Sequence, residues 1–357
     1  MNGSEIRGLH HVTLVTGNHS VNARFYVDVL GLRRVKLSVN QDDVYHRHAF
    51  YANPESTVGS TITFFEWPHL PLGRPGLGSP HHVAYRVGSV ESLRDWYWWL
   101  RENGVPVEGP FERFYGFSIY LPDPDGAVIE LVAPKEGASL DYVRELLTER
   151  VDVDGVGGSM RLISFDHATI LATDPEVVEK FYEKFLGVTG WERARDRSGR
   201  FYLVASEEES DDYLHYVVEP DADYGLVGRG SIHHVAFAVE DERDQRAILR
   251  RLNSARIPNS GVVDRFWFRS LYFRDPEGNL LEVATAGPGY AVDEPSESLG
   301  TRLVLPPWLE PRRREIEEAL AELDSVNPSV WPPDYPSLPE DPESYPLKLR
   351  WPDTFKK

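Results

Sequence analysis

The chain has 357 residues, of which 41% are hydrophobic and 12% aromatic, a composition typical of a globular protein with room for two domains. Its formal net charge of −19 disfavours nucleic acid and anionic membrane surfaces as partners, because both would repel it. Cysteine is absent, which excludes disulfides, thiolate nucleophiles and cysteine-ligated zinc, so any metal would be held by histidine and carboxylate.

The first eight residues lack the apolar core of a secretory signal, and no run approaches the roughly 20 apolar residues that a membrane span needs. We therefore expect a cytoplasmic protein without a membrane or nucleic-acid partner. We also expect a homo-oligomer, whose order the sequence does not give.

Two pairs of repeats run through the chain. Residues 11–31 match residues 167–187, and residues 82–130 match residues 234–282, in both cases without a gap. Four units therefore follow one another, beginning near residues 6, 78, 162 and 229, and they alternate in type.

Each unit predicts the element order β, α, β, β, β. Alternating apolar and polar residues predict a short half-buried strand at its start. In the first unit Val21, Phe25 and Val29 are spaced four residues apart and predict a helix over 20–30. Short β-rich runs separated by turns follow, with the turn at 123–126 as an example.

The repeats divide the chain into four parts. Modules one and two span residues 1–135, a linker with flexible glycines spans 136–161, modules three and four span 162–286, and a C-terminal region spans 287–357. In the last part we predict a helix over 310–323, followed by a Pro-rich tail. We expect four large aromatic residues to pin this tail to the body: Trp331, Tyr335, Tyr345 and Trp351.

A histidine that starts a strand and a glutamate that ends a later one have been duplicated together. On a strand of period two, His234, Ala236 and Ala238 share one face, so the histidine lies among small residues that can border a cavity. Glu282 alternates with core residues and points away from them, and a buried carboxylate is costly unless a cation or metal pairs with it. His11 fits the same picture in the first unit.

Two histidines and one glutamate in a cysteine-free cavity form a facial triad that leaves neighbouring coordination positions for substrate and O₂. Fe(II) suits such a set best, with Mn(II) as the alternative metal. Each residue alone is better explained as a hydrogen-bonded core histidine or a solvated strand end. The duplication of His, Arg, Tyr and Glu in register favours the metal site.

The remaining copies are also complete, since His82, Glu130 and His167 could form a second triad. Against a second site, Arg86 stands where the other copy has Ala238, on the same strand face as His82. A long cation there would fill or repel a metal site, so the sequence leaves the second site open.

The sequence resembles the vicinal oxygen chelate superfamily, and within it the ring-cleaving dioxygenases that are specific for hydroquinones. The resemblance covers about residues 6–323. It rests on several short motifs: LHHVT at 9–13, FFEWP at 64–68, IHHVAFA at 232–238, RFWFRSLY at 265–272, DPEG at 275–278 with LE at 281–282, and DEP at 293–295 with SLG at 298–300.

The resemblance implies an α+β fold in which four βαβββ modules pair into two curved-sheet domains. It makes His11, His234 and Glu282 the metal ligands, so that the first and fourth modules build the site. The implied activity is O₂-dependent cleavage of a hydroquinone-like or catechol-like ring. The resemblance also places five residues around the ligands: His10, Thr13, His233, Arg265 and Tyr272.

Two of these assignments have alternatives. Strict alternation turns His10 and His233 away from the cavity, where they would pack against a loop unless each strand starts irregularly. Arg265 would either stabilise a substrate oxyanion or form a salt bridge to Glu112 or Asp264.

Two other functions are compatible with the superfamily. A glyoxalase-like isomerase or lyase would need a fourth protein ligand, which Glu66 could supply. A non-enzymatic drug-binding module ranks third, because it would have no reason to keep the three ligands together.

Overall fold

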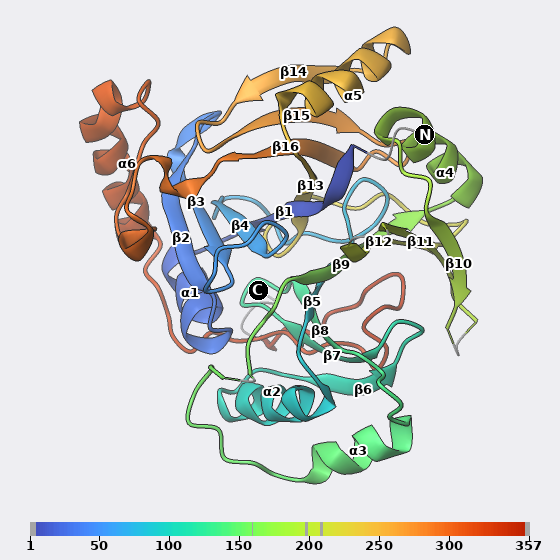
Figure 1. Ribbon diagram of the computed structural model, residues 1–357. Coiled ribbons are helices and arrows are strands. Elements are labelled where there is room, and N and C mark those ends of the chain that lie inside the picture. Colours follow the sequence, from blue (N-terminus) through green and yellow to red (C-terminus); the bar gives the residue numbers. More distant parts are fainter. Residues whose placement is uncertain (1–4, 159, 197–198, 208–209, 354–357) are drawn as a thin grey trace.

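The computed structural model describes residues 5–158, 160–196, 199–207 and 210–353, and two curved sheets form its body (Figure 1). The first sheet joins strands of the first and fourth modules. In spatial order it contains β14 (Asn259–Asp264), β15 (Phe268–Arg274), β16 (Leu280–Pro288), β13 (Ile232–Val239), β1 (Ile6–Thr16), β4 (Thr61–Glu66), β3 (Asp43–Ala52) and β2 (Arg33–Asn40).

The second sheet joins strands of the third and second modules. Its order is β10 (Trp191–Arg195), β11 (Phe201–Glu207), β12 (Ser210–Val218), β9 (Phe165–Ala172), β5 (His82–Arg86), β8 (Val128–Ala133), β7 (Phe117–Pro122) and β6 (Glu108–Glu112). The two sheets have the same pattern of connections, so the predicted fold of paired βαβββ modules is confirmed.

Helices cover the outer sides of both sheets (Figure 1). They are α1 (His19–Arg24), α2 (Val90–Glu102), α3 (Leu140–Thr148), α4 (Pro175–Leu186), α5 (Glu242–Ser254) and α6 (Arg313–Val326). The helix predicted over 20–30 is α1 followed by a π-helical turn, Phe25–Val29. Three 3₁₀ turns complete the C-terminal region: Tyr290–Val292, Ser296–Ser298 and Glu310–Arg312. Helix α3 lies within the span predicted as a linker.

Strand alternation sorts large residues from small ones. On β13, Val235, Phe237 and Val239 belong to the main hydrophobic core, which also contains Ile248 of α5. Ala236 lies on the other, concave side, as its alternation predicts. A small residue therefore lies beside the histidines on the concave side of β13.

Helix α6 packs on the first sheet, where Ile316 and Leu320 contact a cluster that includes Val39 and Val44. Beyond it, the tail contacts the body at each of the four predicted aromatic positions. Arg24 lies 4.5 Å above the Trp331 ring, Tyr335 is 9% exposed, Tyr345 Oη accepts from the Asp223 N–H at 2.7 Å, and Trp351 contacts Gly126. Residues 354–357 of the predicted tail lie outside the described residues.

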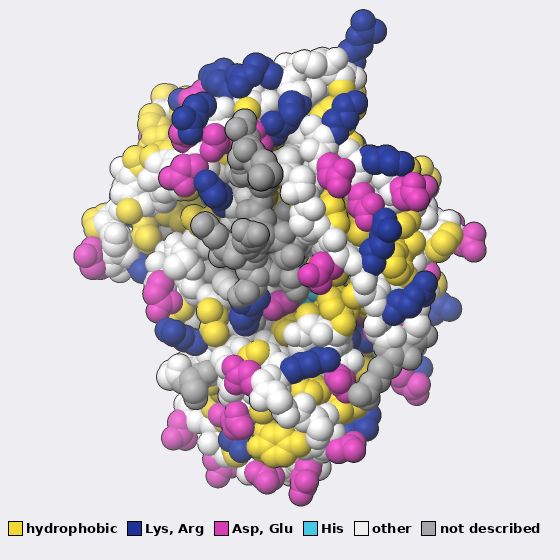
Figure 2. Space-filling view, turned by 45° about the vertical axis from the view of Figure 1, so that its right-hand side comes forward, with side chains coloured by type: hydrophobic (Ala, Val, Ile, Leu, Met, Phe, Trp, Pro, Cys, Tyr) yellow, Lys and Arg dark blue, Asp and Glu magenta, His cyan; other side chains and the backbone are white. Residues whose placement is uncertain are grey.

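Acidic and basic side chains are interspersed over the face of the molecule that Figure 2 shows. Within the described ranges, no helix is long and apolar enough to cross a membrane.

We predict that deleting residues 324–357 lowers the melting temperature by at least about 5 °C. Burial of Tyr335 and Leu338 contributes about 1.5–3 kcal/mol per side chain, and 1 kcal/mol shifts the melting temperature of a large domain by about 2–4 °C. Thermal unfolding followed by circular dichroism measures this. A control that removes only 354–357 should melt like the full chain, and an unchanged melting temperature in the larger deletion would show that the tail adds no stability.

Candidate metal centre

The register of three neighbouring strands brings the first triad together. Ala236 of β13 is paired with His11 of β1 on one side and with Glu282 of β16 on the other. Residues paired across strands share a face of the sheet, and His234 shares that face because it lies two residues before Ala236. The three side chains therefore meet on the concave side of the sheet.

The three donor atoms lie at distances that a metal ion could bridge. Nε2 of His234 is 3.0 Å and Nε2 of His11 is 3.3 Å from Oε2 of Glu282, and the two nitrogens are 3.4 Å apart. Metal–ligand bonds of about 2.1 Å place neighbouring donors about 3.0–3.4 Å apart, depending on the coordination geometry. All three residues are at most 3% exposed.

The polar balance of the triad also fits a metal. Glu282 Oε2 is buried and accepts no hydrogen bond despite its short contacts, whereas Oε1 accepts from the Ser270 hydroxyl at 2.5 Å. Burial alone would raise the pKa of Glu282, but its interactions with His11 and His234 hold that pKa well below its ordinary value. Burial lowers the pKa of His234. A carboxylate and neutral imidazoles are the forms that bind divalent metals.

His10 and His233 lie behind the ligands rather than in the cavity. Each meets the neighbouring ligand histidine through Nδ1, at 2.8 Å in both cases. Strand β1 has the predicted irregularity, with register shifts on either side of Leu9. Burial, and next the charge of the adjacent ligand histidine, lowers the pKa of both residues to about 3.

These Nδ1 contacts can fix the tautomer of the ligands. A neutral His10 accepts through Nδ1 when its own proton is on Nε2, so His11 must donate from Nδ1. That leaves the Nε2 lone pair of His11 facing Glu282, as metal ligation requires. His233 can act on His234 in the same way.

A pocket of about 390 Å³, including its part open to solvent, lies over the triad. Its walls are aromatic, and polar side chains lie among them. The lining residues are His11, Asn40, Gln41, Asp42, His48, Phe50, Phe65, His234, Arg265, Trp267, Phe268 and Tyr272.

Arg265 and Tyr272, both expected near the ligands, line this pocket. The guanidinium lies 5.3 Å from the centre of the Tyr272 ring and donates to Asp42 Oδ2 at 2.7 Å. In the described part of the chain its ion pair is with Asp42, not with Glu112 or Asp264 as the alternative supposed. The ion pair holds the Arg265 side chain against the pocket wall, because Asp42 also lines the pocket.

Thr13 is the start of a polar chain that leads to a residue the sequence analysis missed. The Thr13 and Thr63 hydroxyls are 2.8 Å apart, and Thr63 Oγ1 is 2.9 Å from His48 Nε2. Burial lowers the pKa of His48 well below its ordinary value. Alternation along β3, which places His48 and Phe50 on one face, is the signal that could have identified them.

Glu66 is not placed to be a fourth ligand. Phe65 faces the pocket, so the next residue along β4 faces the other way. Its Oε2 accepts from Arg47 at 2.7 Å and its Oε1 from the His19 N–H at 3.0 Å. The isomerase alternative therefore lacks the ligand that it required.

The second triad is also assembled, because His82, Glu130 and His167 have ligand atoms within 4.8 Å of one another. The expectation that Arg86 fills or repels this site is wrong. Arg86 instead pairs with Asp166 at 3.1 Å, and its side chain is 27% exposed.

We predict that His10→Ala weakens divalent metal binding at the first triad by about 10–100-fold, as loss of a partner that orients a ligand does. Asp166 stands beside His167 where His10 stands beside His11, and its carboxylate lies 2.7 Å from Nδ1 of that histidine. His10→Asp should therefore retain the affinity. Calorimetric titration of chelator-treated protein with Co(II) measures this.

The matched control is His69→Ala, which removes an exposed histidine. Equal affinities for His10→Ala and the wild type would show that His10 does not orient His11.

The chain matches the family model of the glyoxalase/bleomycin resistance protein/dioxygenase superfamily over residues 8–131 and 164–283. It is 32% identical to "Putative ring-cleaving dioxygenase MhqA" of Bacillus subtilis (strain 168), over 88% of this chain and 98% of that protein. It is 26% identical to "Chlorohydroquinone/hydroquinone 1,2-dioxygenase" of Sphingobium indicum, over 87% of this chain and 95% of that protein.

A crystal structure described as a putative dioxygenase from Bacillus subtilis has the same fold. Its TM-score is 0.75 at 29% identity, and the match covers 89% of this chain and 97% of that one. The family model thus matches both halves of the chain, and the alignments cover nearly the whole length of these relatives. The chain belongs to the glyoxalase/bleomycin resistance protein/dioxygenase superfamily.

Proposed function

We propose that this protein is a metal-dependent ring-cleaving dioxygenase that acts with O₂ on a hydroquinone-like or catechol-like aromatic. The observation that carries the proposal is the set of two histidines and one glutamate at the floor of a pocket with aromatic walls. The names of relatives that span nearly the whole chain support the reaction class.

Fe(II), or Mn(II) as the alternative, would be held by His11, His234 and Glu282. When bound, it would supply Lewis acidity toward a substrate hydroxyl and redox chemistry toward O₂. Three protein ligands on one side leave the side facing the pocket for small molecules.

The pocket suits a flat aromatic substrate. Phe50, Phe65, Trp267 and Phe268 provide faces and edges against which a ring can pack. With a ring bound against them, the same side chains would exclude water from the floor of the pocket, which would strengthen the electrostatic interactions there.

Arg265 would balance the negative charge of a deprotonated substrate. Its side chain is 17% exposed and its guanidinium already contacts Asp42 and Tyr272, so it needs little reorganisation to interact with a substrate oxygen. A hydroquinone would bring one hydroxyl to the triad, and its second hydroxyl would lie across the ring.

The chain from His48 through Thr63 to Thr13 provides a route for the substrate proton. Each of its groups can both donate and accept a hydrogen bond, and all three lie beside the ligands. Tyr272, whose ring centre is 5.8 Å from that of His234, places a further hydroxyl near the ligands.

The proposal is tested by O₂ uptake of anaerobically purified, iron-reconstituted protein with a panel of hydroquinones and catechols. We predict that His11→Ala lowers turnover to below about 1% of the wild type, because losing a ligand exceeds the 10–100-fold effect of losing a supporting partner. His167→Ala, the equivalent change in the other sheet, should stay within about threefold of the wild type.

Substrate-dependent O₂ uptake that survives His11→Ala and is lost in His167→Ala would place the reaction in the second sheet. The absence of uptake with every ring tested, in protein that holds iron, would contradict the proposed reaction.

A further inference from the structure

The second triad repeats the geometry of the first. Ala84 of β5 is paired with both Glu130 and His167, just as Ala236 is paired with its two neighbours in the first sheet. Nε2 of His82 is 3.0 Å and Nε2 of His167 is 3.3 Å from Oε2 of Glu130, distances equal to those in the first triad. All three residues are 0% exposed.

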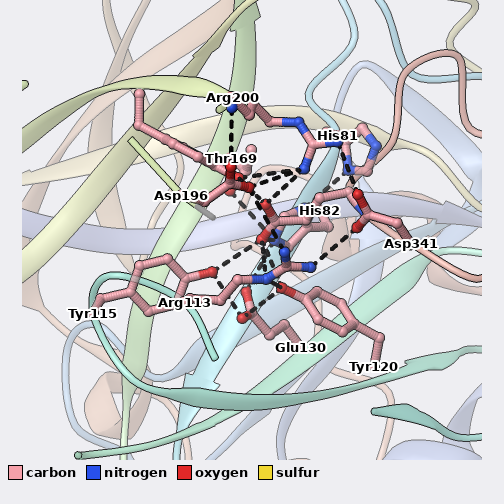
Figure 3. A network of polar contacts seen from close by, with 12 residues as sticks. His81, His82, Arg113, Tyr115, Tyr120, Glu130, Thr169, Asp196, Arg200 and Asp341 are labelled. Carbon is pink, nitrogen blue, oxygen red and sulfur yellow. Dashed lines mark hydrogen bonds and ion pairs between the residues drawn. The ribbon is translucent and has the colours of Figure 1, made fainter. Parts of the chain in front are cut away.

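The supporting contacts are repeated as well. His81 Nδ1 lies 2.9 Å from His82 Nδ1, and Asp166 Oδ1 lies 2.7 Å from His167 Nδ1 (Figure 3 shows the two adjacent histidines). A carboxylate that accepts from Nδ1 of a histidine leaves Nε2 free to bind a metal. Both histidines therefore present Nε2 toward Glu130.

The space that forms a pocket in the first sheet is occupied in the second. Tyr115 and Tyr120 lie over Glu130 (Figure 3), and the C-terminal tail inserts Glu343 beside them. Glu343 is 2% exposed, and its Oε1 lies 3.9 Å from Nε2 of His82. A carboxylate from the tail thus reaches the triad from the side that the first sheet leaves open.

Two arginines hold this part of the tail. Asp341 Oδ1 lies 3.2 Å from Arg113 and its Oδ2 2.9 Å from Arg200, as Figure 3 shows. The same arginines lie 3.5 and 3.6 Å from the Glu343 carboxylate, and Tyr202 donates to Glu343 Oε2. These contacts fix the direction of the Glu343 side chain.

Two tyrosine hydroxyls lie between the buried carboxylates of Glu130 and Glu343, and they have too few protons to donate to every oxygen that they contact. The Tyr115 hydroxyl lies 2.8 Å from Oε1 of Glu130 and 3.0 Å from Oε1 of Glu343, and the Tyr120 hydroxyl lies 2.8 and 2.6 Å from the same atoms. Each hydroxyl has one proton, so two hydrogen bonds serve four contacts. Arg113 and Arg200 lie beside Glu343, and a cation between Glu130 and the two histidines would balance the remaining acceptor oxygens.

We propose that His82, Glu130 and His167 bind a second divalent transition-metal ion, and that Glu343 of the tail covers this site and supports Glu130 through the hydroxyls of Tyr115 and Tyr120. Glu343 Oε1 lies 3.9 Å from Nε2 of His82, farther than the 3.0 and 3.3 Å between Glu130 and the two histidines, so Glu343 would act on the metal through the groups around it.

Two histidines and one glutamate suit Zn(II), and the tyrosines and Glu343 cover the side that the first sheet leaves open, as expected of a structural metal site. The second ion would then anchor the tail and take no part in turnover. The inference does not depend on the reaction proposed for the first site.

The test uses the full chain with the first triad disabled by His11→Ala and His234→Ala together. Chelator-treated protein is reconstituted with Zn(II), passed through a desalting column and analysed for metal and protein. We expect about two ions per chain in the wild type, one in the double variant, and none when His82→Ala is added. Circular dichroism verifies that each variant is folded.

The role of the tail is tested by Glu343→Gln, with Glu340→Gln, an exposed position on the same segment, as the matched control. Glu343→Gln should weaken Zn(II) binding at the second site about 10–100-fold, while Glu340→Gln leaves it unchanged. Bound Zn(II) should also slow proteolysis of the tail.

A folded double variant that binds no metal would overturn the proposal and leave the triad as a buried hydrogen-bonded cluster. Zn(II) bound with equal affinity in Glu343→Gln and Glu340→Gln would overturn the role of the tail. If the double variant does not fold, titrating Glu343→Gln and Glu340→Gln with Co(II) in the wild-type background makes the same comparison.

Discussion

The first site is built by the pairing of a single residue, Ala236 of β13, with residues on both neighbouring strands. Ala236 is opposite His11 on one side and Glu282 on the other, so a ligand from the first module and one from the fourth meet at a single position. A slip of one residue on either strand would turn its ligand to the opposite face. The core residues that alternate with these ligands oppose such a slip, because it would expose them.

The same strand pairing occurs in both sheets, but different residues cover the two triads. Thr13 and Thr169 occupy equivalent positions, and so do their partners Thr63 and His215. Phe65 and Val217 lie two residues after these partners, and each is paired with a residue of the next strand: His48 in the first sheet and Tyr202 in the second. His48 borders an open pocket, whereas Tyr202 donates to a carboxylate of the tail. The first sheet can therefore receive a substrate, and the second is closed by its own chain.

The module order and the positions of the ligands could be predicted because the sequence repeats at fixed offsets and its strands alternate with a period of two. Gap-free repeats gave the module order, and alternation placed His234 and Glu282 on the concave face. The prediction for Arg86 was wrong because alternation along a strand predicts the face on which a side chain begins. It does not predict the direction that a long side chain then takes. Its guanidinium reaches Asp166, a residue on the neighbouring strand that sequence spacing does not connect to it.

Other features depend on contacts between distant segments. Asp42 and Arg265 are 223 positions apart, and Tyr120 and Glu343 are also 223 apart. The Pro-rich composition of the tail indicated irregular structure but not that one of its carboxylates would be buried. Nothing in the local pattern around Glu343 distinguishes it from the exposed Glu340 nearby.

If the first pocket cleaves an aromatic ring with O₂, both oxygen atoms of O₂ must appear in the product. Iron-reconstituted protein would be given a hydroquinone or catechol under ¹⁸O₂, and the product analysed by mass spectrometry. We expect a ring-opened product that contains both atoms of ¹⁸O₂, formed by the wild type and not by His11→Ala. Turnover that yields a product without ¹⁸O, or with the ring intact, would contradict this expectation.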